Sequence, residues 1–300
     1  MKKFTLLMAI ILPGLQSIAQ TDSTLVADTS NRIVKNDTIR IGNILIIKKG
    51  DRNKTSDEKD TDVTMGRRTE RKTNSKVSTN WGVLDLGFAN YDDQTNYANA
   101  GSYLVNKPGS PALDKGDFKL RTGKSINVNI WFFIQRLSLF KNYVNLKYGL
   151  GIELNNYRYK STVNYNEGGL VPYTVNTQTN APFIFRDSIL FSKNKLAADY
   201  VTIPVMLNFI TNTKERKKGV SLSLGVSAGY LYSQRNKQKS NERGKLKNKG
   251  DYNLERFKFS YQAELGVGPV MLYGSYSPKS FYEKSLDMRP YNIGFRFSYW

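Results

Sequence analysis

The sequence predicts an all-β protein: an eight-stranded antiparallel transmembrane β-barrel preceded by a largely disordered periplasmic segment. Three observations lead to this. An export signal opens the chain, segments of alternating apolar and polar residues follow from position 81, and the connections between these segments are short and long in turn. Period-two alternation belongs to strands with two unlike faces, and outer-membrane barrels have short periplasmic turns and long extracellular loops.

The N-terminus has the three parts of a secretory signal peptide. Lysines at positions 2 and 3 precede an apolar run over 4–12, and the small-residue site Ser17-Ile18-Ala19 follows. The apolar run is too short to span a bilayer, so residues 1–19 are predicted to be cleaved. The mature protein then starts near Gln20, outside the cytoplasm.

Residues 20–80 are predicted to be a flexible periplasmic segment, because most of this stretch is polar and contains few aromatic residues. A strand-like island interrupts it at 37–49, where Ile39 and Ile41 alternate with polar residues and an unbroken aliphatic run covers 44–47. Two interpretations stay open. The island is a short strand with no partner of its own, or a docking strand that adds to the sheet of a periplasmic protein.

The barrel is predicted to occupy residues 81–300. Its eight segments show apolar side chains on one face against Gly, Ser, Asn and single charges on the other. In chain order they are 81–91 (apolar positions 84, 86, 88), 124–135 (126, 128, 130, 132, 134), 144–155 (even positions), 200–210 (odd positions 201–209), 220–232 (even positions), 257–267 (odd positions 259–265), 270–277 and 291–300 (odd positions).

The connections supply an independent argument for the barrel. The short ones are 136–142, 211–219 and 268–269, and the long ones are 92–123, 158–199, 233–256 and 278–290. An even strand count with both termini in the periplasm satisfies this alternation. The strands of a β-sandwich and of a lipocalin-like barrel also alternate between apolar and polar residues, but these folds bury the apolar face inside the protein. Small polar residues on the other face instead suit a narrow lumen, with the apolar face in lipid.

The segment YVTIPVMLNF at Tyr200–Phe209 carries an aromatic-x-x-Ile-Pro-aliphatic pattern, and the chain ends on an aromatic residue. In these features residues 81–300 resemble the OmpX/PorT-like outer-membrane β-barrel families of Gram-negative bacteria. The resemblance implies location in the cell outer membrane, with the N-terminal segment in the periplasm. Trp300 departs from the pattern, since it is out of phase with the aromatic residues at 295, 297 and 299. Pro204 is expected to mark a β-bulge, because proline removes a ladder donor.

The predicted lumen face carries both signs of charge. Strand direction places Asp85 and Arg296 at similar heights on neighbouring strands, so we expect them to form an ion pair. Glu264 and Lys147 should complete a lumen charge network. Glu153 and Lys258 face the same way. Paired carboxylates also occur in acid–base and metal sites, but a narrow barrel neutralises buried charges by pairing them, which favours a structural role.

The long connection 233–256 is strongly basic. Its seven cations are Arg235, Lys237, Lys239, Arg243, Lys245, Lys247 and Lys249. We expect this loop to contact phosphates of lipopolysaccharide; simple solubility is the alternative. The formal net charge of +20 is no argument for nucleic acid in an exported protein.

The composition disfavours most enzymes. The chain has no His and no Cys, so it lacks the usual general base, the commonest metal ligand and any thiolate. We therefore expect no catalytic, cofactor-binding or metal-binding residues. The expected function is structural or surface-interacting, with outer-membrane lipid and lipopolysaccharide as partners and no nucleic acid. The alternatives are a small porin, or a secretion or assembly factor that docks a periplasmic partner through 37–49.

Overall fold

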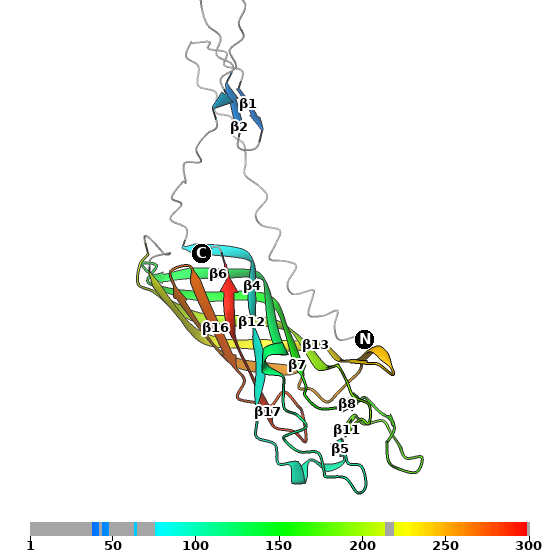
Figure 1. Cartoon of the computed structure of the whole chain (residues 1–300). Helices are drawn as coiled ribbons and strands as arrows, with labels where there is room; N and C mark the ends of the chain where they lie inside the picture. The colour runs from blue at the N-terminus through cyan, green and yellow to red at the C-terminus, as the bar shows by residue number, and fades with distance from the viewer. Residues whose placement is uncertain (1–37, 42–43, 48–62, 65–75, 214–218, 299–300) are drawn as a thin grey trace, which may run out of the picture. The chain divides into compact units, whose positions relative to one another are not determined.

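The computed structural model describes the backbone of residues 38–41, 44–47 and 63–64, and the full residues 76–213 and 219–298 (Figure 1). It divides the chain into two units, Met1–Thr73 and Asn74–Trp300. The predicted signal peptide at 1–19, most of the predicted periplasmic segment and the phase of Trp300 lie outside the described residues.

The N-terminal unit contains a small antiparallel sheet in the order β1-β2-β3. Strands β1 (Thr38–Ile41) and β2 (Ile44–Ile47) pair with each other, and β3 (Val63–Thr64) adds to β2. The island at 37–49 is therefore a hairpin, and the expected single strand without a partner is wrong. The sequence signal was the Gly-Asn pair between the two apolar runs, a residue pair common in two-residue hairpin connections.

The second unit is a closed antiparallel barrel. Its sheet runs in the order β12-β7-β6-β4-β17-β16-β15-β13-β14, and pairing of β12 with β13 closes the ring with β14 outside it. Within the described residues eight strands thus form the barrel, as predicted. They are β4 (Val77–Asp93), β6 (Ile126–Phe140), β7 (Val144–Arg158), β12 (Lys193–Ile210), β13 (Val220–Ser240), β15 (Phe257–Val267), β16 (Val270–Tyr276) and β17 (Met288–Phe297).

Several strands are longer than the alternation indicated. β12 begins at Lys193 instead of 200, β13 continues to Ser240, and the predicted turn 136–142 is largely strand. The predicted loop 233–256 is mostly a hairpin of β13 with β14 (Gly244–Lys249). The extensions of β12 and β13 lie beyond the lipid-facing wall, where the outward side chains are polar, so the apolar alternation ends there before the hydrogen-bonded ladder does.

The remaining elements belong to the long connections at one end of the barrel (Figure 1). They are the strands β5 (Leu104–Val105), β8 (Val163–Asn166), β9 (Gly169–Leu170), β10 (Gln178–Thr179) and β11 (Phe183–Arg186), and the short 3-10 helices η2 (Tyr97–Asn99), η3 (Gly101–Tyr103) and η4 (Thr122–Lys124). A three-stranded sheet, β5-β11-β8, links connections that are far apart in sequence.

The two faces of the wall are mostly those the alternation predicts, and the exceptions lie where a strand changes phase. On β12, for example, Val201 and Ile203 are exposed on the outside, whereas Thr202 is buried inside. On β6, however, Ile134 is fully buried inside and Phe133 packs outside against Trp81, the reverse of the prediction. The register with β7 shifts between Trp131 and Phe133, so a bulge there changes which face the later residues occupy.

The bulge expected at Pro204 is wrong. The register between β12 and β13 runs without a break from Tyr200 to Ile210, and the shift lies between Asp199 and Tyr200. Pro204 instead interrupts the ladder toward β7, where the pairing pauses between Thr202 and Val205 and resumes in the same register. A missing N–H removes a hydrogen bond, but it does not require an extra residue.

Candidate functional site

The predicted lumen charges lie together inside the barrel. The guanidinium of Arg296 on β17 donates to both carboxylate oxygens of Asp85 on β4, with Nε–Oδ1 at 2.6 Å and Nη2–Oδ2 at 2.8 Å. The same guanidinium bonds Glu264 on β15, which also accepts from Lys147 on β7. All four side chains are almost completely buried. The order Asp85–Arg296–Glu264–Lys147 alternates in sign and crosses the lumen, so each charge is compensated.

Two neutral donors that the sequence analysis did not include complete the site around Asp85. Trp131 Nε1 lies 2.7 Å and Asn129 Nδ2 3.1 Å from Asp85 Oδ2. The Trp131 ring also lies under Arg296, with the guanidinium carbon 5.6 Å from the ring centroid. Gly151 leaves room for this ring, because a Cβ at that position would be 2.6 Å from a Trp131 carbon. The signal in the sequence was an indole at a lumen-facing position, where its N–H needs an acceptor.

Glu153 and Lys258, which were predicted only to face the lumen, form a separate cluster. Lys258 bonds Glu153, and its ammonium lies 5.1 Å from the Tyr200 ring centroid. Asn155 and Asn292 donate to the same Glu153 oxygen at 3.0 and 3.1 Å.

Little space remains between the two charge clusters: a cavity lined by residues of both has a volume of about 10 Å³, about enough to hold one water molecule. A second cavity of about 50 Å³ lies at the Lys147 end of the network and is lined in part by Lys147 and Arg136. The carboxylates of Asp85 and Glu153 therefore act as hydrogen-bond acceptors for the cations and amides around them.

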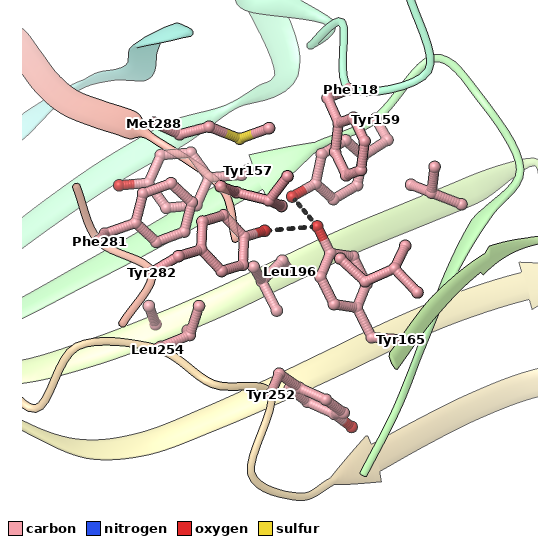
Figure 2. Packing of buried hydrophobic residues seen from close by; sticks show 14 of the residues in the cluster. Phe118, Tyr157, Tyr159, Tyr165, Leu196, Tyr252, Leu254, Phe281, Tyr282 and Met288 are labelled. Carbon is pink, nitrogen blue, oxygen red and sulfur yellow. Dashed lines mark hydrogen bonds between the residues drawn. The ribbon is translucent and has the colours of Figure 1, made fainter. Parts of the chain in front are cut away.

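The connections at the mouth of the barrel share an aromatic core that the sequence analysis did not predict (Figure 2). We call this core and the connections that form it the cap. The buried rings include Phe118, Tyr157, Tyr159, Tyr165, Tyr252, Phe281 and Tyr282. The hydroxyl of Tyr165 is 2.6 Å from that of Tyr159 and 2.7 Å from that of Tyr282, so three buried hydroxyls satisfy one another. Burial raises the pKa of Tyr159 to about 12.

The basic residues predicted at 233–256 form part of a larger surface. Six of the seven lie on the two strands of the β13–β14 hairpin. The seventh, Arg243, lies in the turn between them and forms an ion pair with Asp187, 2.8 Å away. The hairpin register continues onto β12 and β7, which contribute Lys193, Lys195 and Arg158. These three were not predicted as part of the basic surface, because they lie outside 233–256 in the sequence and reach it only through strand pairing.

These features together define a class. An antiparallel barrel with an apolar outer wall, a filled polar lumen and long connections at one end is the architecture of an outer-membrane β-barrel protein. Residues 79–278 match the family described as "Outer membrane protein beta-barrel domain", and the chain belongs to that family. In the part of the chain that the structure describes, no helix is long and apolar enough to cross a membrane.

Solved structures show only loose similarity. Ail, the attachment invasion locus protein of Yersinia pestis, is 14% identical, with 73% of this chain and 98% of Ail covered and a TM-score of 0.28. Ail in complex with the heparin analogue sucrose octasulfate is 12% identical over 72% of this chain and 99% of that chain, with a TM-score of 0.27. A mutant porin of Rh. blastica is 10% identical, with 74% and 100% covered and a TM-score of 0.16. No protein of curated function matches this chain.

Proposed function

We propose that this protein is a closed, non-enzymatic outer-membrane barrel that presents an ordered extracellular surface for interaction. The observation that supports this most directly is the filled lumen. Charges from four strands meet across it, and the cavities beside them have volumes of only about 10 and 50 Å³. Above the lumen, the cap has its own aromatic core. A rigid cap over a closed barrel suits a protein that acts through its outer surface.

The porin alternative is tested by single-channel recording of the refolded full-length chain in planar bilayers. We expect no conductance steps under conditions in which a known porin, inserted in the same bilayer, conducts. A difference in migration on SDS gels between unboiled and boiled protein serves as the control for folding. Regular, reproducible steps from protein that passes this control would favour the porin and contradict the proposal.

A finer placement of the chain is also part of the proposal. The Tyr200–Phe209 segment supports an OmpX/PorT-like branch of the family, in which the N-terminal unit would lie in the periplasm. One observation favours a second candidate function, docking of a periplasmic partner. β1 is at the edge of its sheet and pairs on one side only among the described residues, and such an edge is a site for strand addition.

Crosslinking in the periplasm would test this docking function, with the full chain compared with a variant that lacks 37–49. A partner captured equally well by both chains would contradict docking through this hairpin.

A further inference from the structure

The outer wall of the barrel changes from apolar to cationic along the same strands. On β12 the outward side chains from Phe209 to Val201 are apolar and exposed, whereas further along the same face they are Lys195 and Lys193. On β13 the exposed Tyr230 and Tyr232 come before the basic positions from 235 onward. Tyrosine is typical of the boundary between lipid and water in such barrels. The cations therefore stand on the outside of the wall, just above that boundary.

Strand register arranges these cations in rows across four strands. One row is Arg158–Lys195–Lys237–Lys247, and a second is Lys193–Lys239–Lys245. A third pair, Arg235 with Lys249, lies below them. Neighbouring strands are about 5 Å apart and alternate residues along a strand about 7 Å apart. We call these nine residues, Arg158, Lys193, Lys195, Arg235, Lys237, Lys239, Lys245, Lys247 and Lys249, the cationic lattice.

Few anionic groups compensate the lattice. Within the described residues, Arg235 of the lattice forms an ion pair with Asp199. The nearby Asp251 accepts from Gln234 and from the backbone of Asn253. In this part of β12, above the lipid-facing wall, burial together with repulsion from Lys237 and Lys193 lowers the pKa of Lys195 to about 8. The lattice thus holds like charges close together, an arrangement that a bound anion would stabilise.

A cleft of about 360 Å³ opens at the foot of the lattice. It is lined on one side by Tyr230 and Tyr232 and on the other by Lys249, Asp251 and Arg256. The register shift opposite Asp199 and Tyr200 leaves Tyr232 as an extra residue of β13, and both tyrosines point outward while Leu231 between them is buried. Tyrosine rings offer apolar faces and a polar tip, and guanidinium and ammonium groups bind phosphate.

We propose that the cationic lattice and this cleft bind the phosphorylated sugar headgroup of an outer-leaflet glycolipid of the lipopolysaccharide type. The site adjoins the lipid-facing wall, so a membrane-anchored ligand reaches it without leaving the bilayer. Sugar rings pack on Tyr230 and Tyr232, and phosphates meet the lysine rows. The proposal rests on the orientation in the proposed function, with the cap outside the cell. It extends the predicted basic loop by three cations on two further strands, β7 and β12, and adds an aromatic cleft.

The test is calorimetric titration of purified lipopolysaccharide into the refolded full-length chain in zwitterionic detergent. We expect the triple variant Lys195→Gln, Lys237→Gln, Lys247→Gln to bind at least about tenfold more weakly, because three charge-assisted contacts are lost. The matched control Lys107→Gln, Lys119→Gln, Lys284→Gln removes three exposed lysines from other connections and should stay within about twofold of wild type. Tyr232→Ala tests the cleft without changing the charge and should also weaken binding.

The outcomes separate the possible ligands. Equal losses of affinity in the triple variant and its control would show that only net charge matters, and would overturn the proposal. Saturation by inorganic phosphate, or equal binding of phosphatidylglycerol micelles, would indicate a simple anion site and overturn it too. Unweakened binding by both the lysine triple and Tyr232→Ala would place the site elsewhere. A wild-type chain that binds no lipopolysaccharide but stays non-conducting would refute this inference and leave the closed-barrel function standing.

Discussion

The interior of this protein has two regions of opposite chemistry, although the same strands form both. In the lumen the inward side chains of β7 include Lys147 and Glu153, both buried and ion-paired. Further along the same inward face stands Tyr157, and Tyr159 follows just beyond the strand, both in the aromatic core of the cap. The change from charged to aromatic occurs where the wall leaves the lipid-facing region.

The difference follows from what holds each region in place. The lumen is enclosed by a ring of strands whose backbone groups bond one another, so its side chains need only satisfy each other. The cap consists of long connections whose ordering costs about 1–2 kcal/mol per residue for the backbone alone. Only buried apolar surface offsets a cost of that size. A closed wall therefore tolerates a charged interior, whereas connections that must fold on themselves require an aromatic one.

The largest expected effect comes from breaking the lumen network. Asp85→Ala should lower the free energy of unfolding by about 3–5 kcal/mol, because it leaves the Trp131 N–H without its acceptor and removes one of the two carboxylates that compensate Arg296. The double variant Asp85→Ala, Arg296→Ala should lose less than the sum of the two single variants. Urea unfolding of the barrel in lipid vesicles measures all three. Strictly additive losses would show that the pair is not coupled.

A smaller effect, confined to the cap, is expected from Tyr165→Phe. The change removes the hydroxyl shared with Tyr159 and Tyr282 and leaves buried polar groups unsatisfied, at a cost of about 1–3 kcal/mol. Hydrogen exchange should become faster in the connections and stay unchanged in the barrel strands. The control is Tyr173→Phe, whose exposed hydroxyl bonds the Arg186 carbonyl. Equal changes in cap and barrel would remove the distinction between the two regions.

The third effect is absent near neutral pH: the cap should loosen only in alkaline solution. Burial raises the pKa of Tyr159 from 10.0 to about 12. A raised pKa in the folded state means that its contribution is complete below pH 10 and is lost as pH rises through about 12. Protease sensitivity of the extracellular connections, followed from pH 9 to 12, measures this. Cleavage that does not depend on pH up to 12 would contradict the assigned burial.

Much of the barrel was predictable because lipid imposes a simple rule on sequence. The outward residues must be apolar, so alternation revealed the lipid-facing positions on β12 and the lumen positions of Asp85 and Arg296. Strand direction then placed those two charges at one height. Short and long connections in alternation indicated eight strands. These predictions needed only period two and chain direction, both of which are local properties of the sequence.

Tertiary structure decided the features that leave no periodic pattern in the sequence. The bulge beside Phe132 put Ile134 inside and Phe133 outside, because one extra residue exchanges the two faces of everything after it. The cap joins Tyr159 and Tyr165 of the β7–β12 connection to Tyr282 of the β16–β17 connection, and the cationic lattice joins Arg158 to Lys195 and the β13–β14 hairpin. Strands that extend beyond the lipid need no apolar outward face, so no alternation reveals them. The sequence therefore determined the lipid-facing wall, whereas packing between distant segments determined the surface that the wall supports.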